Sequence, residues 1–298
     1  MPVHNDANAA PPSPGTGPAR NDGVVAFVGG GNMASALIGG LLASGSRAAD
    51  ILVVEPFEAQ RARLAQTFGV QPFAAPDPRL ARAGTVVWAV KPQQFGEAAA
   101  SCAPFVGGAL QLSVMAGIRS DAIARAAGVG NPGSPRVVRA MPNTPALIGR
   151  GIAGLFATAA VDAAGRARVE ALLAPTGRTL WVQREEDLDA VTALSGSGPA
   201  YVFYVLEAMM EAAAQMGLGA EAARQLAIAT FDGAAELARR SELPPEALRA
   251  QVTSKGGTTH AAITSLEADG VKAAFVKALL AAQQRARELG DAFGHPPA

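Results

Sequence analysis

The sequence predicts an α/β protein in which a doubly wound sheet domain is followed by an all-α domain. Three observations predict this fold class. Short apolar runs alternate with helix-like segments in the first part of the chain, a glycine-rich segment directly follows the first run, and only helical patterns appear after about residue 184. We therefore divide the chain into a tail at residues 1–22, a sheet domain at residues 23–184 and a helical domain at residues 185–298.

The composition is that of a globular protein without a strong charge bias. Hydrophobic residues make up 49% of the 298 residues and the formal net charge is zero, so nothing favours nucleic acid or an anionic membrane as a partner. No apolar run reaches the ~18 residues of a membrane span. The Ala-, Pro- and Gly-rich residues 1–22 lack the pattern of a signal peptide, and we expect them to be disordered. Cys102 is the single cysteine, which excludes an internal disulfide, and its helix-like surroundings indicate a packing residue.

The first strand is predicted at Val24–Val28, a continuous apolar run typical of a strand buried on both faces. A Gly-x-Gly-x-x-Ala segment and then an apolar helical pattern follow it, which is the context that a Rossmann dinucleotide site requires. Gly29 permits the tight turn, and Gly31 lets a pyrophosphate approach the backbone. Ala34 allows close packing of the helix on the strand. An ordinary strand–helix turn is the alternative. The cofactor-binding residues predicted here are Gly29, Gly30, Gly31, Asn32, Met33 and Ala34.

The second strand, Ile51–Val54, ends at Glu55, which stands 24 residues after Gly31. An acid at this point hydrogen-bonds the 2′-hydroxyl of the adenosine ribose and repels a 2′-phosphate, which favours NADH. Arg61 and Arg63 follow on the next helix, where either can reach a phosphate. The choice between NADPH and NADH therefore stays open.

The third strand, Thr85–Val90, is closed by Lys91-Pro92, and the proline disfavours helical geometry at Lys91. Lys91 is thus expected at the carboxyl end of its strand, where ligands collect in open α/β sheets. A solvent-facing loop lysine is the alternative. We assign to the cofactor site Ala89, Val90, Lys91 and Pro92.

Four more strands complete the predicted sheet. Leu110–Val114 leads into Ala116 and Gly117, small residues that let a nicotinamide lie against the backbone. Arg136–Ala140 leads into a loop with two prolines around Asn143, which we interpret as a rigid wall of the active site, with a plain turn as the alternative. The last strands are expected at Gly151–Phe156 and Thr179–Val182.

The helical half opens with a long apolar helix, Tyr201–Met216, with Ser197 as its predicted cap. This helix is apolar on most faces, so either its own core or a partner chain must cover it. Its methionines, Met209, Met210 and Met216, are predicted core residues. No His or Cys accompanies its glutamates at ligand spacing, which excludes a metal site. Further helices are predicted at Glu221–Ser241, Pro245–Val252, Thr259–Glu267 and Val271–Leu289.

A polar loop, residues 254–260, separates two of these helices, with the sequence Ser-Lys-Gly-Gly-Thr-Thr-His. Adjacent glycines permit positive φ and close approach of a ligand, and Thr258 or Thr259 is a predicted N-cap for a helix that begins near Ala261. The N–H groups of a helix start bind carboxylates and phosphates. The loop is therefore interpreted as an anion-binding loop, with a capped turn between helices as the alternative.

Acid–base residues are scarce in the chain. The three histidines are His4 and His295 near the ends and His260, which we interpret as a surface residue. Reduction of a ketone usually needs a placed His, Lys or Tyr, whereas a protonated imine arrives with its proton. For such a substrate the protein must bind the anionic group and donate a hydrogen bond to the nitrogen. Thr258, Thr259 and the backbone N–H groups of the glycine loop can supply both.

Several segments, in the same order, resemble the pyrroline-5-carboxylate reductase family. The segment from Leu248 to Glu267, with Val252-Thr253-Ser254-Lys255-Gly256-Gly257-Thr258-Thr259 at its centre, looks like the signature of that family. Similar to the family as well are Gly29–Ala34, Ala89–Pro92, Met141–Pro145 and Ser195–Tyr201, and the match runs from about Val24 to Leu289.

The resemblance implies reduction of Δ1-pyrroline-5-carboxylate to L-proline with NADPH or NADH, the last step of proline biosynthesis, in the cytoplasm. It implies a Rossmann domain and an all-α dimerisation domain, in a homodimer or a decamer of five dimers. The implied catalytic residues are Thr259, Thr258 and Ser254. The implied substrate-binding residues are Gly256, Gly257 and Glu242. We add Lys255, which can bring positive charge to the substrate carboxylate, with a solvated lysine as the alternative. Two residues depart from the family pattern: Glu55, where a small or phosphate-friendly residue is often found, and Lys255, where many members have proline.

Two other functions remain as alternatives. A hydroxyacid or ketone dehydrogenase of Rossmann-plus-helical layout would need a catalytic Lys or His on the long helix, and Tyr201–Met216 contains neither. A non-catalytic nucleotide-sensing protein would not need the intact Gly-Gly-Thr-Thr loop.

Overall fold

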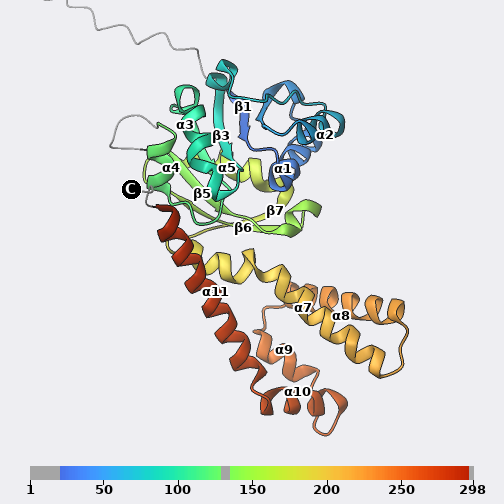
Figure 1. Cartoon of the computed structure of the whole chain (residues 1–298). Helices are drawn as coiled ribbons and strands as arrows, with labels where there is room; N and C mark the ends of the chain where they lie inside the picture. Colours follow the sequence, from blue (N-terminus) through green and yellow to red (C-terminus); the bar gives the residue numbers. More distant parts are fainter. Residues whose placement is uncertain (1–20, 129–134, 295–298) are drawn as a thin grey trace, which may run out of the picture.

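The computed structural model describes residues 21–128 and 135–294, which form a sheet domain and a long helical arm that projects from it (Figure 1). The predicted tail lies outside the described residues except at its end, because the first strand already begins at Asn21. His4 and His295 also lie outside them. In the part of the chain that is described, no helix is long and apolar enough to cross a membrane.

In the described residues, seven strands form one sheet in the order β2-β1-β3-β4-β5-β6-β7. All neighbouring strands are parallel except β5 and β6, which pair antiparallel with Val138 opposite Ala157. Residues 142–150 join these two strands, and so short a connection cannot hold a parallel crossover. The predicted doubly wound sheet is confirmed with this one antiparallel pair. The strands are β1 Asn21–Val28, β2 Ile51–Val54, β3 Ala83–Trp88, β4 Leu110–Ser113, β5 Val137–Met141, β6 Gly151–Ala157 and β7 Gly177–Trp181.

Helices cover both faces of the sheet and create two apolar cores. One core packs α1, α2 and α5 on the sheet around Phe27, Leu37 and Val169, and the other packs α3 and α4 around Trp88 and Ile123. Buried strands of this kind need apolar residues in succession, which is the pattern that predicted them. The helices of the sheet domain are α1 Asn32–Ala43, α2 Glu58–Phe68, α3 Phe95–Val106, α4 Ser120–Ala126 and α5 Ala163–Leu173. Short 3₁₀ helices are η1 Ala48–Asp50, η2 Pro78–Arg82, η3 Pro92–Gln94, η4 Thr144–Ile148 and η5 Ala174–Thr176.

The helical arm, residues 198–294, follows α6 and the π-helical turn η6. The four further helices predicted after the long helix are all present, and the all-α character of this part is confirmed. The predicted cap of Thr258 or Thr259 is wrong: Gly257 is the N-cap of α10, and Thr258 and Thr259 are its first two residues. Ser197 stands directly before α7 as predicted, but its side chain makes no capping bond. The elements are α6 Asp187–Val191, η6 Thr192–Gly196, α7 Gly198–Gln215, α8 Ala220–Arg240, α9 Pro245–Gln251, α10 Thr258–Ala268 and α11 Val271–Gly294.

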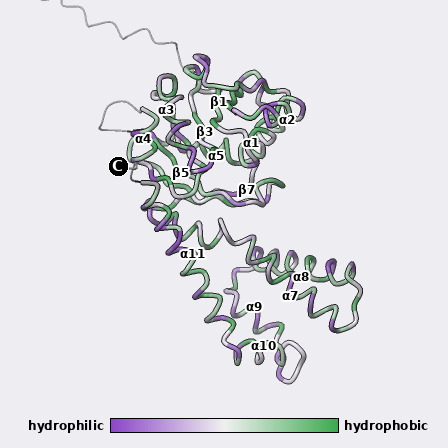
Figure 2. Tube along the Cα trace, in the orientation of Figure 1, coloured by the Kyte–Doolittle hydropathy of each residue, from purple (hydrophilic) through white to green (hydrophobic). Residues whose placement is uncertain are grey.

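Many apolar residues lie along the helices of the arm (Figure 2), and many of their side chains are exposed. The sequence left open whether α7 is covered by the chain's own core or by a partner chain. No residue of α7 is buried, which excludes the chain's own core. Met216, predicted as a core residue, is 77% exposed, while Met209 and Met210 are half-buried. Among the large apolar residues exposed on the arm are Phe203, Tyr204, Leu226, Leu237, Phe275, Val276 and Leu280. Large apolar residues that lie exposed together on one part of a folded chain mark an interface with another molecule.

A set of charged residues, here called the junction cluster, joins the arm to the sheet domain. Arg139 on β5 donates to Glu185 at 2.9 Å, and Glu185 also accepts from the hydroxyl of Ser120 at 2.7 Å. Arg119 lies 3.8 Å from Asp189 on α6 and 3.7 Å from Asp291 on α11. Burial raises the pKa of Asp189 above its ordinary value, although Arg119, Arg139 and Arg287 oppose the shift and Asp291 adds to it.

Candidate active site

The glycine loop after β1 has the geometry of a dinucleotide site. Gly29 has φ +94°, and a Cβ there would lie 2.7 Å from the carbonyl oxygen of Ala89, so only glycine fits between β1 and β3. Gly31 is the N-cap of α1, with open space for 4 Å around the position of a Cβ. No side chain caps α1, which leaves the N–H groups of its first turn for an anion.

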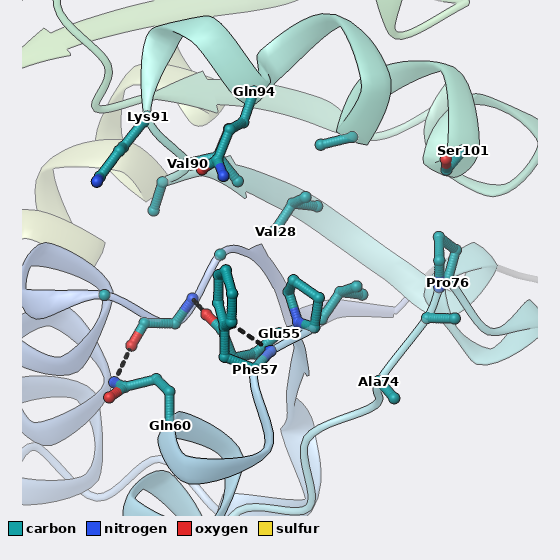
Figure 3. Close-up of a pocket in the computed structure, with 18 of the residues that line it drawn as sticks. Val28, Glu55, Phe57, Gln60, Ala74, Pro76, Val90, Lys91, Gln94 and Ser101 are labelled. Atoms are coloured by element: carbon teal, nitrogen blue, oxygen red, sulfur yellow. Dashed lines mark hydrogen bonds between the residues drawn. The ribbon is translucent and has the colours of Figure 1, made fainter.

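A cavity of about 760 Å³ opens beside this loop (Figure 3). Such a volume suits a ligand of cofactor size. Of the predicted cofactor residues it brings together Gly29, Gly30, Gly31, Glu55, Ala89, Val90 and Lys91. The loop, the helix start and the cavity therefore fit a dinucleotide.

Glu55 lies at the end of β2, where the sequence predicted an acid facing the adenosine ribose. The residue is only 5% exposed, and both of its oxygens are engaged: Oε2 accepts from the Gly30 N–H and Oε1 from the Phe57 N–H, each at 2.9 Å. Gln60 on α2 donates to the carbonyl oxygen of Gly30. Glu55 thus fixes the glycine loop as well as lining the cavity, a role that sequence analysis missed.

Lys91 follows β3 in extended geometry, as Pro92 predicted, and its exposed side chain lines the cavity. In Figure 3, Lys91 and Gln94 lie across the cavity from Gln60. Several predicted cofactor residues do not line this cavity, namely Asn32, Met33, Ala34, Pro92, Ala116, Gly117 and Asn143. Ala34 is fully buried, in agreement with its predicted packing role.

Asn143 lines a second, largely apolar cavity of about 480 Å³ between the η4 loop, α7 and α11. Both ends of its amide are engaged in the fold, because Nδ2 donates to Ser195 at 3.2 Å and Oδ1 accepts from Ile152 at 3.0 Å. Asn143 thus links β6 to the turn before α7.

The predicted substrate loop, Ser254–Thr259, joins α9 to α10. Gly256 has φ +77°, and the N–H of Gly257 donates to the carbonyl oxygen of Ser254 at 3.1 Å, which closes a tight turn. Among the described residues, the hydroxyls of Thr258 and Thr259 have no hydrogen-bond partner. Arg249 donates to Glu267 at 2.9 Å and holds α9 against α10. Glu242 and Lys255 are exposed nearby in sequence.

Within one chain, the two halves of the predicted site are separated. Figure 1 shows α9 and α10 at the end of the arm, away from the sheet that carries the cavity. The structure brings the cofactor residues together and the loop residues together, but it does not bring the two groups into one place.

Sequence analysis missed several residues of the cavity. Phe57, an aromatic residue 64% exposed at the edge of the cavity, precedes α2, and Gln60 lies on α2 near Arg63, which was already expected within reach of a phosphate. Their position directly after the strand-end Glu55 was the available signal. On α3 the cavity also meets Cys102, which is buried as predicted; burial raises the pKa of its thiol to about 11, so it is a poor nucleophile.

Comparison with protein families gives matches to both parts of the chain. Residues 185–289 match the family described as pyrroline-5-carboxylate reductase dimerisation. Residues 24–117 match the family described as NADP oxidoreductase, coenzyme F420-dependent.

Individual proteins show likeness over nearly the whole chain. A pyrroline-5-carboxylate reductase of Pseudomonas aeruginosa is 43% identical over 271 residues, which cover 91% of this chain and 98% of that protein. The solved structure of a pyrroline-5-carboxylate reductase from Coxiella burnetii aligns with a TM-score of 0.82 at 37% identity, covering 90% and 99% of the two chains. That of Plasmodium falciparum pyrroline carboxylate reductase with NADP bound aligns with a TM-score of 0.79 at 26% identity, covering 90% and 98%.

Proposed function

The chain belongs to the pyrroline-5-carboxylate reductase family, and from that premise we propose how its residues carry out the reaction. It is an oxidoreductase that reduces Δ1-pyrroline-5-carboxylate to L-proline with NADPH or NADH, the last step of proline biosynthesis. The single observation that supports the details most is the loop Ser254–Thr259, which presents two unpaired hydroxyls and a helix start to solvent.

We assign the substrate carboxylate to the start of α10. The backbone N–H groups of Thr258 and Thr259 lie in the first turn of the helix, and no side chain caps them. Hydrogen bonds to a charged group contribute about 1.5–3 kcal/mol each, so two or three of them orient a small carboxylate firmly. Lys255, which is exposed in the same loop, adds positive charge to it.

The ring nitrogen is assigned to the hydroxyl of Thr259. As hydride adds to the carbon of the C=N bond, the nitrogen gains a lone pair and becomes an amine, which the hydroxyl can stabilise as a hydrogen-bond donor. Thr258 and Ser254 complete the polar side of the site, and Glu242 accepts from the ring N–H. The reduced nicotinamide supplies the hydride when bound in the cavity beside Gly31.

The working unit is proposed to be a homodimer in which the loop of one chain meets the cofactor cavity of the other. Separation of these two features within one chain and the apolar arm both support this assignment. The proposed division into a sheet domain at residues 23–184 and a dimerisation domain at residues 185–298 follows from it. Assembly of five dimers into a decamer and a cytoplasmic location belong to the same proposal, and light scattering and cell fractionation test them.

Mixed dimers test the shared site. Gly31→Glu places a carboxylate in the open space of the cofactor cavity, and Thr259→Ala removes the hydroxyl of the loop. Co-refolding the two variants gives heterodimers with one fully native site if sites are shared, and recovery of activity is then expected. Activity that stays at the level of the separate variants would mean that each chain builds its site alone.

A direct assay tests the reaction itself. The purified protein is given NADPH or NADH with Δ1-pyrroline-5-carboxylate, and in parallel with a simple 2-keto acid. Turnover of the imine well above that of the keto acid is expected, because a protonated imine arrives with its proton, whereas a ketone oxygen needs a proton donor placed against it. Preference for the keto acid would overturn the proposal.

A further inference from the structure

We propose that this enzyme selects NADH over NADPH, and that Glu55 makes the selection. The inference rests on the proposed function, since it names the coenzyme of the same site. The relative from Plasmodium falciparum was solved with NADP bound, and the preference proposed for this chain therefore has to follow from its own residues.

Glu55 places a fixed negative charge in the wall of the cavity. Its two oxygens accept from the N–H groups of Gly30 and Phe57, which come from different loops, and only 5% of the residue is exposed. Turning the side chain away would leave both N–H groups without their acceptor and release the glycine loop. The carboxylate therefore stays where it is when a ligand enters.

This charge lies at the end of β2, where doubly wound folds receive the adenosine ribose of a dinucleotide. A carboxylate only accepts hydrogen bonds, and each oxygen keeps a further lone pair after its bond to the backbone. A ribose 2′-hydroxyl can donate to that lone pair. A 2′-phosphate brings only acceptors and negative charge, so it is repelled.

The start of α2, the other natural place for a phosphate, is already occupied by acids. Phe57 is its N-cap, and the Phe57 N–H donates to Glu55. Glu58 adds a second acid in the first turn. These two carboxylates already offset the partial positive charge that a helix start would otherwise offer to a phosphate.

The nearby cations do not reverse this balance. Arg61 donates to the backbone carbonyl oxygens of Glu55 at 3.0 Å and Pro56 at 2.6 Å, and it does not line the cavity. Arg63 lines the cavity but is exposed, so water and salt screen it. Lys91 lies after β3, on the far side of the cavity from α2 in Figure 3, and a further acid, Glu97, also lines the cavity.

Direct binding measures the preference without any turnover. Fluorescence titration of the purified protein with NADH and with NADPH is expected to give a dissociation constant for NADH at least about tenfold lower. The ratio of kcat/KM values for the two coenzymes with Δ1-pyrroline-5-carboxylate is expected to agree. Equal affinities, or tighter binding of NADPH, would overturn the inference. If NADPH binds more tightly and the imine is still turned over, the coenzyme inference fails while the proposed reaction stands.

The variant Glu55→Gln tests the residue. It keeps an acceptor for one of the two N–H groups and removes the charge, so the NADH-to-NADPH preference is expected to fall by about 10–100-fold. A looser glycine loop would weaken the binding of both coenzymes alike and leave the ratio of their dissociation constants unchanged. Removal of the charge would change that ratio. An unchanged ratio would remove Glu55 from coenzyme selection.

Two control variants complete the test. Glu58→Gln removes the same charge three residues away, at an exposed position that does not line the cavity, and the ratio is expected to change less than threefold. Arg63→Ala is expected to affect both coenzymes similarly. A selective loss of NADPH binding in Arg63→Ala, from a native protein that binds NADPH well, would assign the 2′-phosphate to Arg63 and overturn the inference.

Discussion

Gly29 and Gly31 belong to the same turn but have different requirements. Gly29 has φ +94° and a backbone carbonyl 2.7 Å from the place of a Cβ, whereas Gly31 has φ −66° and open space. Gly29→Ala is therefore expected to lower the free energy of unfolding by about 1–3 kcal/mol or more, and Gly31→Ala by less than about 0.5 kcal/mol. Urea unfolding measures both. Equal losses in the two variants would contradict the assignment of strain to Gly29.

Thr259 is the residue on which the chemistry of the loop depends most. Thr259→Ala is expected to lower kcat/KM for the imine by about 10–1,000-fold, which corresponds to about 1.4–4 kcal/mol of transition-state stabilisation. Thr264→Ala is the matched control, because its hydroxyl lies on the same helix and donates to the carbonyl of His260 instead. If both variants keep native kcat/KM, Thr259 has no part in the mechanism.

The residues of the cofactor cavity could be predicted where a motif or a strand end marked them. Gly29 to Gly31, Glu55 and Ala89 to Lys91 all line the cavity. Phe57 and Gln60 were missed because α2 carries no motif. The contacts of Asn143 with Ser195 and Ile152 could not be predicted, because they depend on how β6 returns along β5, and its place in the wall of the active site stays a prediction.

At the scale of elements, the order of strands and helices could be predicted from the sequence but two features could not. Strand direction is not encoded in an apolar run, so the antiparallel pairing of β5 and β6 appears only in the structure. The start of α10 was placed too late because glycine and threonine are both common caps. The turn from Ser254 to Gly257 makes Gly257 the N-cap, because Gly257 has extended geometry, with φ −82° and ψ 174°, directly before the helix.

The junction of α6 with α11 is expected to depend on pH through Asp189. Its pKa is raised in the folded protein, so between the ordinary value and the raised one the folded state holds a proton that the unfolded state has released. Stability therefore falls as pH rises through this window. Asp189→Asn cannot carry the buried charge, so it does not lose stability in this window. The free energy of unfolding of the variant minus that of the native protein is therefore expected to be larger at pH 7 than at pH 4.

Asp187 on the same helix is the control of opposite sign for this experiment. The hydrogen bond from Arg184 lowers the pKa of the Asp187 carboxyl, and the pair is exposed. Asp187→Asn is expected to give no gain at pH 7, in urea unfolding under the same conditions. A gain for Asp189→Asn that is larger at pH 4 than at pH 7 would contradict the direction of its shift.

At the scale of the whole molecule, the sequence could predict a helical domain but not what covers it. An apolar run such as Tyr201–Met216 has the same pattern whether its own chain or a partner buries it. Met216 shows the consequence, since it was predicted as core and is 77% exposed. Only the arrangement of α7, α8 and α11 in space separates the two cases.

A charge on the arm is expected to break the assembly. Phe203 on α7 is 59% exposed, and Phe203→Glu would bury a carboxylate in any interface that covers this helix. Sedimentation velocity is expected to show a smaller species, and turnover of the imine to fall by at least about tenfold while NADH binding remains. Leu180→Glu, at a residue 57% exposed on β7, is the control and leaves the assembly unchanged. A native sedimentation coefficient for Phe203→Glu would exclude α7 from the interface.

The arm follows the sheet domain in the chain and is therefore synthesised after it. The sheet domain leaves the ribosome first and can bury both of its cores while the arm is still being made. The arm, once complete, still exposes Phe203, Phe275 and its other apolar residues, and it must meet a second chain to cover them. Assembly of newly made enzyme is therefore a bimolecular step, and its rate depends on the concentration of the chain. In a cell that makes few copies, active enzyme for proline synthesis appears later than the folding of either domain alone would require.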